Sequence, residues 1–252
     1  MRRVLHVCAL AFTVACSQSP SSSAPDLPQT PAPSAAIRVL MVTATVGFRH
    51  DSIPEARQAV ATLATQSRAF TVAATEDVGE LTAARLASVD VLMFALTTGE
   101  LPLGSDQKTA IVDFVTNGGG FIGVHSASDT LYEWPEYGRI VGAYFKEHPW
   151  TQQATVSVED AAHPICSGLG ARFTLTEEFY TFRENPRSKV HMLLSLDPAS
   201  VGAQGDFPLA WTQTIGRGRS YYNALGHFSA TWNDSRFRSQ IANAIRWAAG
   251  RN

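Results

Sequence analysis

The chain has 252 residues, of which 45% are hydrophobic and 17% are charged, and its formal net charge is −2. This balance is typical of a globular protein and excludes disorder over most of the chain. The length suffices for one large α/β domain or two small ones. The sequence contains no run of lysine and arginine, so we expect no nucleic-acid partner.

The N-terminal segment has the pattern of an export signal. Arg2 and Arg3 precede an apolar stretch, VLHVCALAFTVA, that is too short to be a stable membrane anchor. The stretch ends at Ala15-Cys16, which resembles the cleavage site of bacterial lipoproteins; ordinary secretory cleavage nearby is the alternative. We therefore predict a signal peptide over residues 1–15, a lipid anchor to the membrane at Cys16, and an exported periplasmic or outer-membrane lipoprotein of a bacterium.

Residues 16–36 are rich in serine, proline and alanine and have no apolar periodicity. Such a segment buries too little surface to offset its chain entropy, so we predict a flexible tether followed by one folded domain over residues 37–252. Cys166 is the single cysteine of that domain, which excludes a disulfide within it. We expect Cys166 to be a small buried side chain rather than a nucleophile.

From residue 37 onward the apolar pattern alternates between strands and helices. We expect strands at 37–44, 70–77, 89–96 and 121–126, and helices at 52–67, 81–88 and 105–119. Ser105 is expected to cap the third helix and Gly118 to close it. This order predicts an α/β fold with a parallel sheet and helices on both faces.

Beyond about residue 150 the sequence predicts further strands, at 154–160, 173–182, 190–196 and 209–225, and a final helix at 237–250. Residues 215–218, IGRG, resemble a hairpin turn between two antiparallel strands. We therefore expect antiparallel additions at one edge of a mostly parallel sheet, towards the C-terminal half.

Ligands of such sheets bind beyond the carboxyl ends of the strands, where the loops after the first, third and fourth strands should meet. The segment GGGFIGVHSASDT, residues 118–130, ends its strand in a Gly-x-His-x-Ala turn that presents His125 to this cleft. His50 and His227 also lie at strand ends. Histidine titrates near neutrality, so these residues suit proton transfer or metal binding.

Carboxylates accompany these histidines in the sequence. Asp129 follows His125 by four residues, and we expect it to point into the same cleft and to fix the tautomer of the imidazole. Glu177, Glu178 and Tyr180 of the segment EEFY are further candidates for acid–base work, although a solvated strand edge is the alternative. The histidine spacing matches no compact zinc motif, so a bound divalent metal remains one alternative.

Aromatic residues follow His125 in the segment LYEWPEYG. Tyr132, Trp134 and Tyr137 have flat faces and polar tips that suit sugar rings, or they pack the loop onto the domain; both interpretations stay open. Tyr180 and His148 complete the residues that we expect to bind substrate.

Several segments together resemble the ThuA-like family, named for trehalose utilisation. They are GFRHDSI, GGGFIGVHSASDT, WPEYGRIVGAYFKEHP, EEFYTF, NPR, PLAW and GRGRSYYNALGH, in this order, and the resemblance runs from about residue 37 to residue 250. It implies a class I glutamine amidotransferase-like fold, in which a flavodoxin-like, doubly wound sheet carries helices on both faces.

Two differences from the glutamine amidotransferases argue against amidotransferase chemistry in this chain. Those enzymes have Gly-x-Cys-x-Gly at the strand-to-helix elbow and a later His-x-Glu, whereas this chain has His125 at the elbow and Ser229 two residues after His227. Without the thiol and the orienting carboxylate, a thioester with glutamine has no route.

The family is associated with disaccharide catabolism, on sugars that a partner sugar dehydrogenase oxidises to a 3-keto form. A positioned base such as His125 or Glu178 would then remove a proton next to the keto group, for isomerisation or elimination of the glycoside. We expect His50, His125, Asp129, Glu178 and His227 to line the cleft. The alternatives are a non-catalytic carbohydrate-binding module and a hydrolase that uses metal-activated water.

Overall fold

The computed structural model describes residues 36–251. The predicted signal peptide, the lipid site at Cys16 and nearly all of the tether lie outside the described residues. Within residues 36–251, no helix combines the length and the apolar character needed to cross a membrane.

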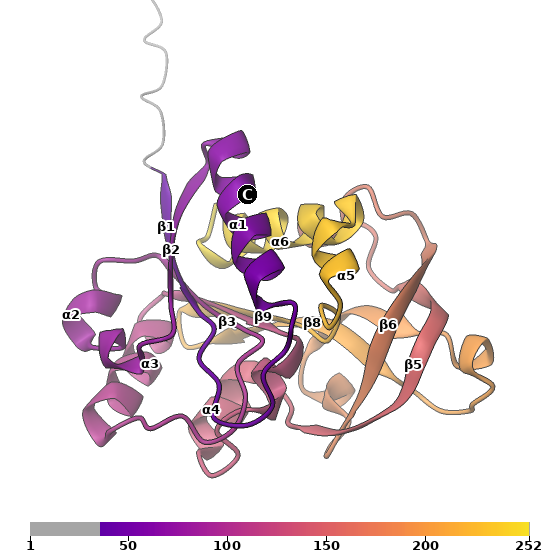
Figure 1. Ribbon diagram of the computed structural model, residues 1–252, viewed down its shortest axis with the longest axis horizontal. Coiled ribbons are helices and arrows are strands. Elements are labelled where there is room, and N and C mark those ends of the chain that lie inside the picture. Colours follow the sequence, from indigo (N-terminus) through magenta and orange to yellow (C-terminus); the bar gives the residue numbers. More distant parts are fainter. Residues whose placement is uncertain (1–35, 252) are drawn as a thin grey trace, which may run out of the picture. The chain divides into compact units, whose positions relative to one another are not determined.

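A mixed sheet forms the centre of the described domain (Figure 1). Its strand order is β2-β1-β3-β4-β9-β8-β7-β5-β6. The strands are β1 (Ile37–Val42), β2 (Phe70–Thr75), β3 (Val91–Ala95), β4 (Gly120–Val124), β5 (Phe145–Val158), β6 (Arg172–Phe182), β7 (His191–Leu196), β8 (Pro208–Ile215) and β9 (Gly218–Asn223).

The sheet is divided into a parallel and an antiparallel half, which corrects the expected mostly parallel sheet. The pairings from β2 to β9 through β1, β3 and β4 are parallel. Those from β9 through β8, β7 and β5 to β6 are antiparallel. The predicted hairpin at residues 215–218 is confirmed, because Ile215 pairs with Gly218 across it. This turn reverses the chain so that β9 runs parallel to β4, in the middle of the sheet.

Helices cover both faces of the sheet. They are α1 (Ile53–Ser67), α2 (Ala83–Leu86), α3 (Ser105–Thr116), α4 (Pro135–Val141), α5 (Ser229–Asn233) and α6 (Ser235–Ala248). Neighbouring residues of a strand point to opposite faces. On β9, Ser220 donates a hydrogen bond to Ile140 of α4, whereas Tyr221 donates to Gln240 of α6. Thus α4 and α6 lie on opposite faces.

The expected elements of the N-terminal half are all present. β3 and β4 are completely buried, which explains their unbroken apolar sequences. One cap differs from the expectation: α3 begins after Gly104, whose N–H donates to Gln107, and Ser105 is the first helical residue. Gly118 follows the cap residue Asn117 with φ 117°, as expected of a closing glycine.

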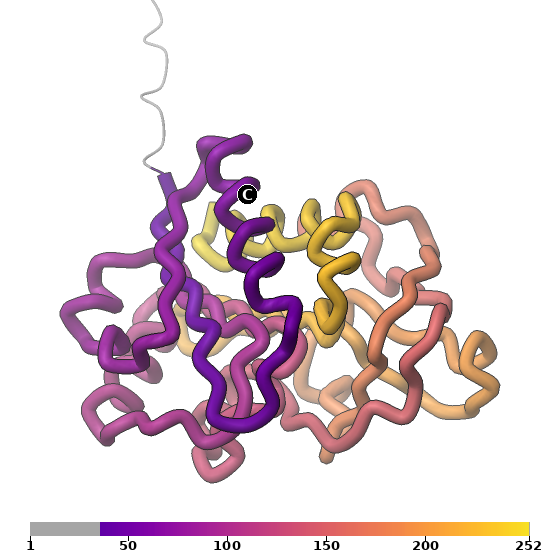
Figure 2. The backbone as a smooth tube through the Cα atoms, in the orientation of Figure 1, coloured from indigo at the N-terminus to yellow at the C-terminus, as the bar shows by residue number. Residues whose placement is uncertain are grey.

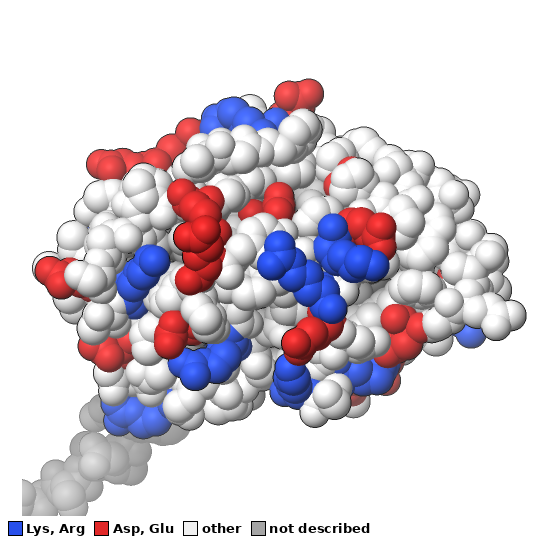
Figure 3. All heavy atoms as spheres, turned by 90° about the horizontal axis from the view of Figure 1, so that it is seen from below, with Lys and Arg blue, Asp and Glu red and all other residues white. Residues whose placement is uncertain are grey.

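The loops after β1, β3 and β4 gather at one edge of the sheet (Figure 2). Two isolated bridges join them, Thr45 with Thr98 and Gly99 with Thr130. This edge is the carboxyl end of the parallel strands, where the fold positions its site. On the face that Figure 3 shows, acidic and basic side chains are interspersed rather than gathered by sign.

Candidate active site

His125 stands at the elbow between β4 and a short 3₁₀ helix, η2 (His125–Asp129). Its φ of 53° lies in the left-handed region, which is uncommon for a residue with a side chain and occurs mostly at turns and functional sites. A Cβ at Gly123 would lie 3.1 Å from the Tyr222 ring and 3.3 Å from the Cβ of Ala127. The small residues on either side of His125 therefore let this elbow close tightly.

The backbone fixes the tautomer of His125. Its Nδ1 lies 2.7 Å from the carbonyl oxygen of Ala224, which only accepts hydrogen bonds, so Nδ1 carries the proton. In the neutral ring, Nε2 then has a free lone pair. That atom lies 2.9 Å from the Tyr180 hydroxyl and 3.2 Å from Nδ1 of His227. Nε2 of this fully buried ring thus faces the centre of the site.

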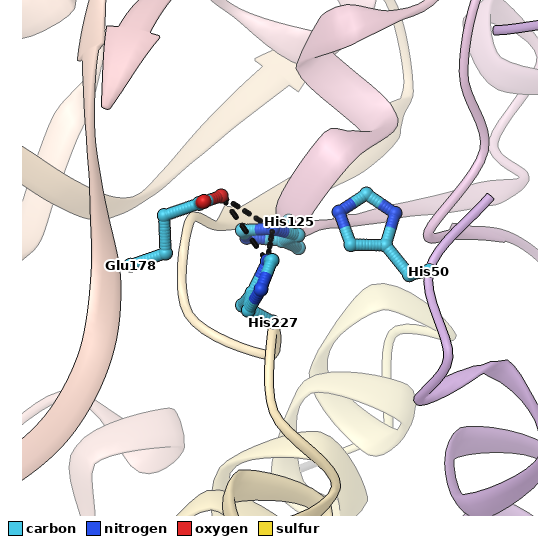
Figure 4. A group of neighbouring side chains, drawn as sticks. All are labelled: His50, His125, Glu178 and His227. Carbon is cyan, nitrogen blue, oxygen red and sulfur yellow. Dashed lines mark hydrogen bonds and ion pairs between the residues drawn. The ribbon is translucent and has the colours of Figure 1, made fainter. Parts of the chain in front are cut away.

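Four side chains converge around this point, and Figure 4 shows them directed toward one another. They are His50 from the loop after β1, His125 from the elbow, Glu178 from β6 and His227 from the loop after β9. One donor atom of each lies within 4.8 Å of the others. The Glu178 carboxylate is 3.1 Å from Nδ1 of His227 and 3.5 Å from Nε2 of His125.

Burial and mutual charge set the protonation states of this cluster. Burial, together with the positive charge that His125 and His227 would carry, lowers the pKa of His50 to about 3, so its ring is neutral. Burial opposes the charge on Glu178, but the neighbouring His125 and His227 rings outweigh it and lower the pKa of Glu178. Burial likewise opposes charge on His227, but Glu178 raises the pKa of that ring. Glu178 and His227 therefore form an ion pair.

Glu177 holds the loop that carries His227. This carboxylate is fully buried and accepts hydrogen bonds from the N–H of Gly226, the N–H of His227 and the Thr231 hydroxyl, at 2.9, 3.1 and 2.6 Å. The sequence suggested Glu177 for acid–base work, but these donors engage both of its oxygens. Its role here is to position His227.

A cavity of about 220 Å³ opens beside the cluster. Its lining consists of Phe48, His50, Asp129, Phe145, His148, Glu178, Tyr180 and His227. Six of these eight residues were expected from the sequence. Phe48 and Phe145 were not, although both lie in segments that resemble the ThuA-like family, GFRHDSI and WPEYGRIVGAYFKEHP. His148 lies in β5 rather than in a loop, and its Nδ1 is 3.4 Å from the Glu178 carboxylate.

The expected pairing of Asp129 with His125 is wrong. Asp129 does line the same cavity, but its Oδ1 accepts a 2.6 Å hydrogen bond from the Tyr132 hydroxyl. The carboxylate beside His125 is Glu178, which comes from a distant strand. Burial raises the pKa of Asp129, and the hydrogen bond from Tyr132 partly opposes that rise.

The three aromatic residues after the elbow pack the loop onto the domain. Trp134 is 5% exposed and Tyr137 is fully buried, with its hydroxyl donating to the carbonyl of Ala127. These two rings are therefore not available to a substrate, and of the two interpretations left open by the sequence the structure supports packing rather than sugar binding. Tyr132 positions Asp129, and the Arg183 guanidinium covers its ring at 3.9 Å.

The cluster fits a divalent cation. Imidazole nitrogens and a carboxylate suit zinc and neighbouring transition metals. The backbone bond to Nδ1 of His125 leaves Nε2 free to bind, which is the arrangement usual around metal-bound histidine. His50 is neutral, as a ligand must be. A cation would replace the proton that His227 and Glu178 share.

Cys166 takes no part in this site. It lies in the 3₁₀ helix η3 (Pro164–Cys166), and burial raises the pKa of its thiol to about 12. The expected structural role of this cysteine agrees with its burial.

Comparison with known proteins identifies relatives of this fold. A ThuA-like protein from Bacteroides uniformis is 24% identical, with a TM-score of 0.72 over 88% of this chain and 95% of its own. A ThuA-like protein from Parabacteroides merdae is 19% identical, with a TM-score of 0.70 over 86% and 91%. A β-galactosidase from Bacillus circulans is 13% identical, with a TM-score of 0.56 over 86% of this chain and 31% of its own. At these identities the likeness shows the fold alone.

Among curated proteins, none matches the chain. The ThuA family, described as trehalose utilisation, matches residues 38–248, which is nearly all of the described domain. That description suggests a role in carbohydrate metabolism. The chain belongs to the ThuA family.

Proposed function

We propose that this protein is an enzyme that transfers a proton on a carbohydrate bearing a keto group, at the cavity beside the histidine cluster. The convergence of His50, His125, Glu178 and His227 next to the Asp129 carboxylate carries this proposal. The family description supports the class of substrate. The interspersed charges around this edge (Figure 3) are compatible with a neutral ligand such as a sugar.

In this proposal the four clustered side chains hold a divalent cation. When bound, the cation would supply Lewis acidity to a substrate carbonyl oxygen. His125 would bind through Nε2, because Nδ1 is committed to Ala224. Tyr180 supplies a hydroxyl at the same point and would donate a hydrogen bond to a substrate oxygen.

Asp129 is then the base. Unlike the four clustered side chains, it stands apart from the cation site yet lines the cavity. Tyr132 occupies Oδ1, and no other side chain among residues 36–251 donates to the carboxylate. Its other oxygen would take the proton from the carbon next to the keto group, and the C–H electron pair would move toward the carbonyl oxygen. Return of the proton gives isomerisation; loss of the glycosidic oxygen from the next carbon gives elimination.

Removal of that C–H proton is common to both outcomes, so the loss of its NMR signal provides the test. We expect the protein to exchange this proton for deuterium in a 3-keto-disaccharide dissolved in D₂O, followed by NMR. Asp129→Asn keeps the acceptor for Tyr132 and should slow exchange by about 10²-fold or more. Glu133→Gln, at an exposed position on the same loop, is the matched control and should behave as the unmodified protein.

His125→Asn tests the cluster without disturbing the elbow, because asparagine tolerates the left-handed conformation better than alanine does. We expect exchange to be lost. Unchanged exchange in Asp129→Asn would refute the assignment of the base. Tight binding of the sugar with no exchange by the unmodified protein would instead favour a carbohydrate-binding module.

We also propose export and lipid attachment at Cys16, with a sugar dehydrogenase supplying the keto-sugar. The basic and apolar pattern of residues 1–15 supports export. Cys16→Ser should move the protein from the detergent phase to the aqueous phase in Triton X-114 partitioning. Retention in the detergent phase would contradict lipid attachment.

A further inference from the structure

Two large apolar side chains stand exposed beside the cavity. Phe48 is 66% exposed and Val46 is 61% exposed, and within residues 36–251 they are the exposed large hydrophobic residues. Both belong to the short segment between β1 and α1. Phe48 also lines the cavity, and its ring packs in a T-shaped contact with His50 at a centroid distance of 4.9 Å. One part of this ring thus faces the site and the remainder faces solvent.

The segment that carries them is held in place by the neighbouring loop. The hydroxyl of Thr98 donates to the carbonyl of Phe48 at 2.7 Å, and the N–H of Val46 donates to the carbonyl of Thr98 at 2.9 Å. Gly99 has φ 74°, and a Cβ there would lie 2.8 Å from the nitrogen of Gly47. These contacts hold the backbone from which Phe48 projects, which lowers the entropy cost of binding a ligand there.

The size of the cavity limits what it encloses. Its volume of about 220 Å³ is below the ~300–1,000 Å³ of pockets that surround drug-sized ligands, and suits one sugar ring. A disaccharide or other glycoside would place its second ring outside. Phe145 and His148, stacked at 5.8 Å, already form part of the cavity wall. Among the residues that line the cavity, Phe48 is the one with a large apolar surface that extends outside the cavity and is exposed to solvent.

We infer that Phe48 is the platform of an outer subsite, on which the second ring of a glycoside packs while the first ring occupies the cavity. The C–H face of a sugar ring is apolar and gains from covering a flat aromatic surface. Val46 extends the same apolar surface. This inference rests on the proposed function, because it assigns to Phe48 the recognition of the second ring of the glycoside on which the proposed chemistry acts.

The test compares the affinities of 3-keto-glucose and 3-keto-trehalose by calorimetry. We expect the unmodified protein to bind the disaccharide more tightly. In Phe48→Ala the ratio of the two affinities should fall about tenfold, as for a truncated aromatic contact. Phe48→Tyr keeps the flat ring and should keep the ratio. Since Phe48 is exposed, the melting temperature of both variants should stay close to that of the unmodified protein.

If Phe48→Ala lowers the affinities for both ligands by the same factor, the inference is overturned, since Phe48 would then contact the inner ring alone. An unmodified protein that binds the disaccharide no more tightly than the monosaccharide would also overturn it. Calorimetry requires no turnover, so these results are independent of the deuterium exchange. Loss of exchange with a preserved, Phe48-dependent affinity ratio would refute the proposed chemistry and leave the outer subsite standing.

Discussion

Nδ1 of His125 donates a 2.7 Å hydrogen bond to the carbonyl oxygen of Ala224, 99 residues further along the chain. Ala224 directly follows β9, which pairs in parallel with β4, the strand that ends before His125. The position of β9 in the middle of the sheet therefore determines which nitrogen of His125 faces the cavity. It also brings His227, three residues beyond Ala224, into contact with Nε2.

Metal content is the first prediction from this cluster. Protein purified without a histidine tag should contain about one divalent cation per chain, measured by inductively coupled plasma mass spectrometry. A chelator should lower its melting temperature, because a ligand of the folded state stabilises it by mass action. His50→Asn should lose most of the metal. His191→Gln, an exposed histidine outside the cluster, is the control. Metal-free protein whose melting temperature does not respond to added Zn²⁺ or Mn²⁺ would contradict the site.

Glu177 should affect the metal through His227. In Glu177→Gln an NH₂ group replaces one of the two carboxylate oxygens. One oxygen accepts hydrogen bonds from the backbone N–H of Gly226 and the Thr231 hydroxyl, the other accepts from the backbone N–H of His227, and an NH₂ group cannot accept in either place. We expect metal affinity to fall by about 10–100-fold, as for partners that orient metal ligands. Unfolding in urea should show a loss of about 1–3 kcal/mol.

Glu184→Gln provides the comparison for that variant, because Glu184 is an exposed residue paired with Lys189. It should change neither quantity by much. If Glu177→Gln lowers stability but leaves metal affinity intact, Glu177 supports the fold alone and does not position His227.

The thiol of Cys166 should be inert in the native protein. Burial raises its pKa to about 12, so almost no thiolate is present at pH 8. We expect iodoacetamide to modify Cys166 in urea but not in buffer, as read from the Cys166 peptide by mass spectrometry. Cys166→Ala should keep deuterium exchange. Rapid labelling of the native protein, or loss of deuterium exchange in Cys166→Ala, would show that the Cys166 thiol takes part in the reaction.

His163 should make the protein less stable in acid. Its Nδ1 accepts the N–H of Ile165 at the start of η3, so the ring must be neutral there. Burial lowers its pKa from the ordinary value, with His191 and Arg219 adding to the effect against Asp160. A folded pKa below the unfolded value of about 6.5 means that its stabilisation is complete above that pH and is lost as the pH falls through the folded pKa.

His163→Asn tests this directly, because asparagine keeps an acceptor at the cap and does not titrate. The melting temperature of the unmodified protein should fall relative to that of the variant between pH 7.5 and pH 5. A difference that stays constant over this range would show that His163 does not contribute to the acid sensitivity.

Local patterns in the sequence were sufficient for the elements and for the elbow. Continuous apolar runs predicted β1, β3 and β4, because strands buried on both faces need no alternation. Small residues around His125 predicted a tight turn after β4, and the structure has one. These features depend on residues that are close to one another along the chain, so they can be inferred from the sequence alone.

Contacts between distant segments were decided only by the tertiary structure. Spacing suggested Asp129 as the partner of His125, but the fold brings Glu178 from β6 to that position and turns Asp129 toward Tyr132. Trp134 and Tyr137 had the composition of a sugar platform, yet packing buries both. Phe48 remains exposed because its loop is held by Thr98 on a different segment.

The sequence by itself determined the strands, the helices and the presence of histidine at the elbow, since each follows from short-range apolar periodicity and turn geometry. Only the tertiary structure decided which side chains meet: the β8–β9 hairpin places β9 beside β4 and so brings His227 to His125, and β6 brings Glu178 to the same point. Such contacts depend on the order of strands in the sheet and on which side chains are buried, and neither can be inferred from the spacing of residues along the chain.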